Sequence, residues 1–140
     1  MLGYASFYAL MPSDNPDPIA PGGDVAFPSN GPIGTTSVTR DGDSAFTLVE
    51  AGTYFVSFVV SATESGQLVL TLNGEELPYT RVGRDSGGAQ IVNTTIITTT
   101  EDGAVLTVRN PDAAFDTLSL TENAGGSVPV SAQLVILRLA

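Results

Sequence analysis

Residues 52–61, "GTYFVSFVVS", carry large apolar side chains on both faces of an extended strand. Tyr, Phe and Val crowd together here, and these residue types favour β-strands. Successive side chains of a strand point to opposite faces. One face takes Tyr54, Val56, Phe58 and Val60 and is uniformly apolar. The other face is half apolar, with Phe55 and Val59 among Thr and Ser. An antiparallel strand with one solvated face would alternate more cleanly, so something must cover Phe55 and Val59.

The closing segment, residues 128–140, has the same two-faced pattern. Leu134, Val135, Ile136 and Leu137 follow one another, so both faces of a strand there are apolar. Such a strand is predicted to be central in a sheet that another layer covers. A chain of 140 residues has no spare layer beyond one sandwich, and a second copy of the chain is the simplest cover. The two segments together predict a homo-oligomer.

Strands are predicted over most of the remaining chain, because no stretch has a sustained helical period of 3.6 residues. The 16 Thr and 14 Val agree with an all-β protein. Asn73-Gly74 is a strong hairpin signal. The Pro- and Gly-rich residues 12–24 cannot form a central strand and are predicted to be an ordered surface excursion. The predicted strands fall near residues 4–10, 35–40, 44–49, 67–72, 75–82, 89–100, 104–109 and 115–120, with a short edge strand near 25–27.

Residues 67–72, "QLVLTL", alternate between apolar and more polar positions. The pattern predicts a half-buried strand with one face toward the core. Leu68, Leu70 and Leu72 are expected to point inward. Gln67, Val69 and Thr71 are expected to point outward.

The residue types used most often in catalysis are missing from this chain. It has no His, no Cys and no Lys, which removes the commonest general base, the thiol nucleophile and Schiff-base chemistry. Fifteen acidic residues make some carboxylate pair inevitable. Glu75-Glu76, after the hairpin turn, is interpreted as an exposed, charged edge. The sequence therefore predicts no catalytic residues and no enzyme activity.

The net charge of −10 limits which partners this chain can bind. Nucleic acid and anionic membranes are both poor partners for an acidic surface. No apolar run approaches the ~20 residues that a membrane helix needs. We therefore expect neither nucleic-acid binding nor membrane insertion. The absence of Cys also excludes disulfides.

Two loops place carboxylates a few residues apart, "DNPD" at 14–17 and "RDGDS" at 40–44. Ca²⁺ takes oxygen ligands of this kind. Asp and Asn are also favoured in tight turns, and the EF-hand spacing is absent. The turn interpretation is preferred, so we expect no cofactor and no metal ligands, with Ca²⁺ as the alternative.

Four segments together resemble a known family. They are "FTLVEAGTYFVSFVVS", "LVLTLNGEELP", "AQIVNTTIITTTEDGAVLTVRN" and the closing "VSAQLVILRLA". An aromatic strand after an "AG" turn, an "NG" hairpin and an apolar last strand resemble the C-terminal globular domain of bacterial collagen-like surface proteins. These proteins include the Bacillus collagen-like spore-surface glycoproteins of the BclA type. The likeness covers residues 35–140, and is weaker upstream.

The resemblance implies an all-β fold, a jelly-roll sandwich of about ten strands in the superfamily of tumour necrosis factor (TNF) and complement heads. Residues 1–140 would form one such domain, assembled as a tight homotrimer. In the family this domain follows a Gly-X-Y collagen-like stalk, nucleates its triple helix and caps the fibre. This sequence contains no Gly-X-Y repeat, so an upstream stalk is implied by resemblance alone. The implied location is extracellular, on a spore surface (the exosporium) or a cell surface. Related domains also occur on phage fibres.

The resemblance also implies which residues meet in the trimer. In such trimers the sheet that contains the strand after the "AG" turn and the terminal strand is buried around the three-fold axis. The uniformly apolar face, from Tyr54 to Val60, is assigned to the core of the subunit itself. The predicted trimer-interface residues are Phe55, Val59, Val135, Leu137 and Leu139.

Two functions from different classes follow. The first is a non-catalytic trimerisation and capping domain of a surface fibre. The second is an adhesion head that binds a host surface protein or a glycan, since binding on a rigid sandwich usually resides in loops. Its candidate loops are residues 12–23, 83–88 and 122–127, which contain no anchor aromatic. A hydrolase is the least supported alternative.

Overall fold

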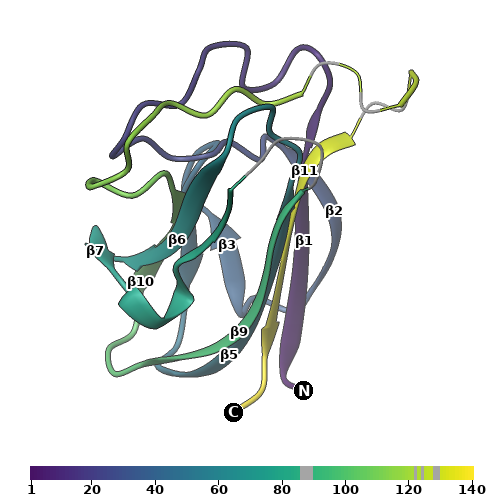
Figure 1. Ribbon diagram of the computed structural model, residues 1–140. Coiled ribbons are helices and arrows are strands. Elements are labelled where there is room, and N and C mark those ends of the chain that lie inside the picture. The colour runs from purple at the N-terminus through teal and green to yellow at the C-terminus, as the bar shows by residue number, and fades with distance from the viewer. Residues whose placement is uncertain (86–89, 122, 124, 128–129) are drawn as a thin grey trace.

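Extended segments rich in β-branched and aromatic residues pair into two antiparallel sheets, which pack face to face (Figure 1). The computed structural model describes residues 1–85, 90–121, 123, 125–127 and 130–140. The first sheet has the strand order β2-β1-β11-β5-β9. The second has the order β3-β4-β10-β6-β7, with β8 also paired to β6. Many neighbouring strands are distant in sequence, as the strand crossovers of a jelly roll require.

The strand bounds follow most of the predicted segments. Those of the first sheet are β1 (Gly3–Leu10), β2 (Ser29–Gly34), β5 (Gly52–Val60), β9 (Ile91–Thr99) and β11 (Val130–Arg138). Those of the second are β3 (Val38–Arg40), β4 (Phe46–Leu48), β6 (Gly66–Leu72), β7 (Glu75–Glu76), β8 (Val82–Arg84) and β10 (Ala104–Arg109). β2 was not expected, because it contains Pro32. It lies at the edge of its sheet, where a missing N–H is tolerated.

The hydrophobic core fills the space between the sheets. Tyr54, Val56, Phe58 and Val60 of β5 are all buried, so the predicted core face of this strand is confirmed. The Phe7 and Phe46 rings stack with their centroids 4.3 Å apart. Arg40 closes this end of the core, with its guanidinium carbon 5.0 Å from the centre of the Phe7 ring. The central position of β5 and β11 in the first sheet also agrees with prediction.

The hairpin at Asn73-Gly74 is confirmed. Both residues have positive φ, 52° and 83°, as a two-residue hairpin turn requires. The predicted strand after it is broken by a 3₁₀ turn, Pro78–Thr80, into β7 and β8. Pro78 cannot donate to the ladder, which explains the break. Among the described residues, no helix is long and apolar enough to cross a membrane.

The excursion after β1 is ordered, as expected, and pairs with the segment after β10 along one end of the sandwich (Figure 1). Ile19 and Leu118 form an isolated antiparallel bridge, as do Asp24 and Arg109. The side-chain amide of the buried Asn110 donates to the Ile19 carbonyl at 2.9 Å.

Two strand predictions in these segments were wrong. Residues 115–120 do not form a strand. Leu118 and Leu120 each form one isolated bridge, with Ile19 and Ala62, because the segments opposite are irregular and pair at one residue only. Residues 25–27 are not an edge strand. Val25 and Phe27 are fully buried, and their N–H groups donate to the carbonyls of Val108 and Asp43.

The outward positions predicted for β6 were also partly wrong. Gln67 is exposed, but Val69 and Thr71 are completely buried. In the register of the sheet Val69 stands beside Arg109, and Thr71 stands between Thr107 and Glu76. Arg109 forms an ion pair with Asp24 at 2.9 Å, and Glu76 accepts the N–H of Asp112 at 2.9 Å. These long side chains and the returning loop cover the outer face, which strand alternation alone could not reveal.

Candidate assembly surface

The outer face of the first sheet, which points away from the core, is the candidate functional surface. Its composition follows from the strand register, because directly paired residues share a face. One row across four strands joins Tyr4, Leu137, Phe55 and Ile96. A second row joins Tyr8, Gln133, Val59 and Val92. Both rows are largely apolar, although they face outward.

A more polar row lies between these two. It joins Ser6, Val135, Ser57 and Thr94. The Ser57 and Thr94 hydroxyls lie 3.3 Å apart, within hydrogen-bond distance. The outer face is therefore banded, with apolar rows on both sides of a row of small hydroxyl side chains and one valine.

Several apolar side chains on this face are strongly exposed in the single chain. Ile96 is 56% exposed, Val92 50% and Tyr4 42%. Exposed apolar residues are ordinary when they are scattered, but here they share one face with half-buried apolar neighbours on the same sheet. A contiguous apolar patch of this kind marks a surface that another molecule covers.

The structure places four of the five predicted interface residues on one face. Phe55, Val59, Val135 and Leu137 all lie on this face and are half-buried. Leu139 follows the end of β11 and is exposed, with its N–H donating to the Thr53 carbonyl at 2.8 Å. Leu137 and Phe55 are direct cross-strand partners. Their contact with a neighbouring subunit is a prediction that the single chain does not test.

The sequence analysis missed four aromatic or aliphatic members of the face, Tyr4, Tyr8, Val92 and Ile96. The segment of β9 was predicted as a strand within residues 89–100, but none of its residues was assigned to the interface. Its adjacent Ile96 and Ile97 nevertheless carry the same two-faced signal as Leu134 to Leu137, because Ile97 is buried while Ile96 faces out. Tyr4 could not be placed without the register of β1 against β11.

A polar cluster closes the end of the sandwich where the two termini lie side by side (Figure 1). Arg138 of β11 forms an ion pair with Glu50 at 2.8 Å. The hydroxyl of Tyr54 donates to the Glu50 carbonyl at 2.6 Å. Burial raises the pKa of Tyr54 above its ordinary value, so this hydroxyl stays a donor at neutral pH. The cluster anchors the start of β5, next to Phe55 of the first apolar row.

Two glutamates elsewhere are held by hydrogen bonds. Burial by itself would raise the pKa of Glu64, but the N–H and hydroxyl of Ser119 donate to its carboxylate and lower the pKa below the ordinary value. The pKa of Glu76 is lowered by the Asp112 N–H and by Arg81. The pKa of Arg109 is raised by its hydrogen bond with Asp24. These groups are structural and lie away from the outer face of the first sheet.

Of the four carboxylates weighed as Ca²⁺ ligands, that of Asp14 has a local hydrogen-bond partner. The Asp14 carboxylate accepts the Leu10 N–H at 2.7 Å. The Asn15 amide binds both the N–H and the carbonyl of Ala26, and Asn15 has a positive φ of 53°. This is turn chemistry. Within the described residues, no group of three or more Asp or Glu side chains is placed to hold a metal ion.

Solved structures of low sequence identity share this fold. Murine APRIL at pH 8.0 matches with a TM-score of 0.64 and 13% identity, over 98% of each chain. Rabbit GITRL matches with a TM-score of 0.57 and 13% identity, over 99% of this chain and 94% of that one. The globular domain of zebrafish complement 1qA has a TM-score of 0.57 and 13% identity, over 98% of this chain and 99% of that one. The fold is thus a jelly roll of the TNF and complement-head class.

The family follows from a sequence model. The model of the BclA C-terminal domain matches residues 17–140, and the chain belongs to this family. It is the TNF-like head domain of collagen-like surface proteins, a non-catalytic family. A search of curated protein sequences found no match. The family model begins after β1, yet β1 is an interior strand of the first sheet, between β2 and β11.

Proposed function

We propose that the domain is a trimerisation head, and that the outer face of the first sheet is its subunit interface. The observation that carries the proposal is the pair of apolar rows across β1, β11, β5 and β9. Water contact with these rows is unfavourable by about 25 cal/mol per Å² of apolar surface. In a closed trimer, neighbouring copies remove this apolar surface from water on each of the three subunits.

Three copies fit the face better than two. A two-fold dimer would place the same patch of two chains against each other. Here the exposed apolar residues continue onto the edge strand β9, where Val92 and Ile96 lie. A head-to-tail contact can use the edge of one chain and the central strands of the next, and such contacts close into rings. Heads of the TNF and complement class typically form trimers, which supports a ring of three.

The biological role proposed for this head is to nucleate and cap a collagen-like fibre on a surface. The N-terminus lies at one end of the sandwich beside the C-terminus (Figure 1). Three parallel copies would present three N-termini together, where a three-stranded stalk could start. Membership of the BclA family supports a spore surface, the exosporium, as the location.

The test is the mass of the isolated domain in solution. Sedimentation equilibrium at micromolar concentration and neutral pH is expected to give three times the 14.4 kDa of one chain. An obligate interface of this kind buries over ~2,000 Å² in total, so the trimer should be the main species at this concentration. A monomeric or dimeric mass would overturn the proposal.

A further inference from the structure

A hollow of about 750 Å³ is lined by residues of the second sheet and of the loop after β10. It lies where β6 begins and β8 ends, opposite the loop at residues 113–116. The volume is within the range of small-molecule sites in proteins. Six of the residues that line it are Gly66, Gln67, Arg84, Asp85, Phe115 and Asp116.

Phe115 forms one wall, and its ring is fully exposed. The loop that carries it is braced on both sides. The Ala114 N–H donates to the Pro111 carbonyl at 3.0 Å, and the amide of the buried Asn110 donates to the Asp116 carbonyl at 3.1 Å. The braced backbone keeps the loop in place, and the exposed ring offers a flat apolar surface on which a ligand can stack.

The other wall is polar, and its Arg84 side chain is held by backbone carbonyls. Gly66 and Arg84 are paired in the ladder between β6 and β8. The Arg84 guanidinium donates to the Glu64 carbonyl, at 3.2 Å from Nε and 2.6 Å from Nη2, and also to the Ala62 carbonyl. The side chains of Gln67 and Asp85 are exposed at the hollow. This wall therefore offers the Gln67 amide and the Asp85 carboxylate as hydrogen-bond groups, beside a guanidinium that backbone carbonyls hold in place.

The charge of the hollow limits what it can bind. Among its described lining residues, two carboxylates, Asp85 and Asp116, accompany one guanidinium that is engaged with backbone carbonyls. The whole chain carries a net charge of −10. An anionic ligand would be repelled. A neutral ligand with one apolar face and several hydroxyl groups would stack on Phe115 and donate to the carboxylates.

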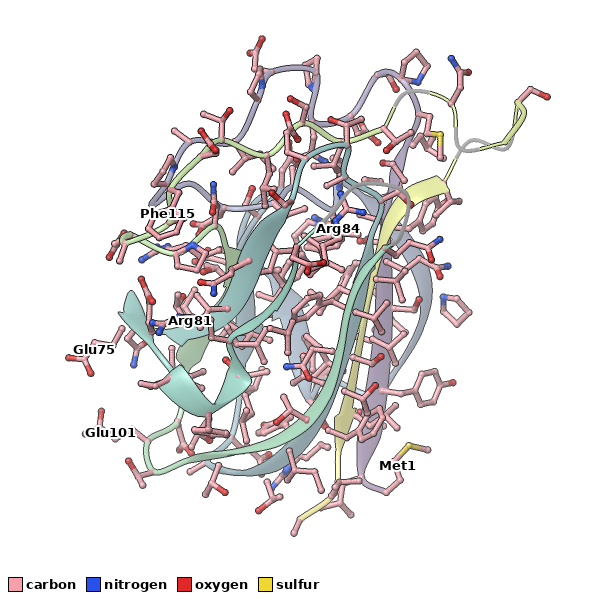
Figure 2. All side chains as sticks on the ribbon, viewed as in Figure 1. Met1, Glu75, Arg81, Arg84, Glu101 and Phe115 are labelled. Carbon is pink, nitrogen blue, oxygen red and sulfur yellow. The ribbon has the colours of Figure 1, made fainter. Side chains whose placement is uncertain are left out.

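We propose that this hollow binds a neutral sugar residue of a glycan, with Phe115 as the stacking platform. A pyranose ring has an apolar C–H face and hydroxyls around its edge, which matches one aromatic wall and one polar wall. The lining residues belong to no strand of the first sheet, and Figure 2 shows Phe115 on the side of the molecule away from β1 and β11. The site would thus stay open when the apolar face is covered.

Saturation-transfer difference NMR on the whole domain tests the proposal. The probes are the methyl glycosides of glucose, galactose, mannose and N-acetylglucosamine at millimolar concentration, with N-acetylneuraminic acid as the anionic comparator. At least one neutral glycoside is expected to receive saturation, strongest at its C–H face. Phe115→Ala should weaken that binding by about tenfold or more. The substitution removes a fully exposed side chain, so the fold should not change.

Tyr79→Ala is the matched control, because Tyr79 is another exposed aromatic residue and lies outside the hollow. It should leave glycoside binding and the sedimentation mass unchanged. The proposal is overturned if no neutral glycoside receives saturation, if Phe115→Ala leaves binding intact, or if only the anionic sugar binds. Because sedimentation reports the trimer separately, failure of sugar binding would leave the proposed assembly standing.

Discussion

At the scale of single residues, Phe55 and Leu137 are the sharpest probes of the outer face, because they are direct partners in its best-formed apolar row. Phe55→Ser and Leu137→Ser should each dissociate the proposed trimer while leaving the subunit folded. Burial of such a side chain contributes about 2–5 kcal/mol per site, and the loss occurs three times in a symmetric trimer. Sedimentation and circular dichroism on the same samples measure both effects.

Two matched variants separate assembly from folding. Thr94→Ser changes an exposed polar residue of the same face and should leave the trimer intact. Leu70→Ser changes a fully buried residue of β6 and should unfold the subunit itself. If Phe55→Ser and Leu137→Ser keep the trimer mass and the melting temperature of the parent, the proposed interface is in the wrong place.

Glu64 gives a prediction about acid stability. Its pKa is lowered in the folded state because the Ser119 N–H and hydroxyl donate to the carboxylate, which outweighs the effect of burial. A depressed pKa stabilises the fold above the unfolded value of about 4.3, and this contribution is lost as the pH falls through the folded value. Glu64→Gln should lower the melting temperature at neutral pH and flatten its fall below about pH 4.3.

Thermal melts of the parent and Glu64→Gln at neutral and acidic pH measure this effect. Glu75→Gln is the control, since Glu75 is exposed and accepts none of the described side-chain hydrogen bonds. Parallel melting curves for the parent and Glu64→Gln across the acidic range would show that the Ser119 contacts do not stabilise the ionised form.

At the scale of elements, β1 carries a prediction, because the family model begins after it. Phe7 of β1 is fully buried and stacks on Phe46, 4.3 Å between ring centroids. Phe7→Ala should cost about 3–5 kcal/mol of unfolding free energy, whereas Tyr79→Ala, at a residue 64% exposed, should cost little. Urea titration followed by circular dichroism gives both values. A loss below 1 kcal/mol at Phe7, roughly the lower limit for a core substitution, would mean that β1 is dispensable.

Period-two patterns made the central strands predictable element by element. The two-faced segments of β5 and β11, the core face from Tyr54 to Val60 and the hairpin at Asn73-Gly74 all follow from local rules. Such rules describe one strand at a time. The burial of Val69 depends on a loop and long side chains from elsewhere, so alternation placed it wrongly in water.

Features that depend on pairing between distant segments were beyond the sequence. Tyr4 and Ile96 join one row only through the registers of β1 with β11 and of β5 with β9. The hollow likewise needs Arg84 of β8 and Phe115 of the loop after β10 to line the same space. Of the candidate binding loops, residues 83–85 line the hollow, whereas residues 12–23 are not among its lining residues. Residues 86–88, 122 and 124 lie outside the described residues. Tertiary pairing, rather than local propensity, creates these surfaces.

At the scale of the whole molecule, net charge and apolar contact oppose each other. Each chain carries −10, so three chains in a trimer repel one another, while the proposed interface is mostly uncharged. The ion pair nearest the face, Arg138 with Glu50, lies within one chain. Assembly should therefore be driven by burial of apolar surface and weakened by repulsion that salt can screen.

Added salt should consequently strengthen the trimer. Sedimentation equilibrium in about 0.02 M and about 0.5 M NaCl should show the same mass at high concentration and less dissociation on dilution at the higher salt, where the screening length is only a few ångströms. Apolar burial is not screened by salt. The direction of the salt effect on trimer stability is therefore set by the repulsion between the like-charged subunits. An interface held by ion pairs between chains would respond in the opposite direction. Dissociation that increases with NaCl would therefore rule out the apolar face as the main contact between subunits.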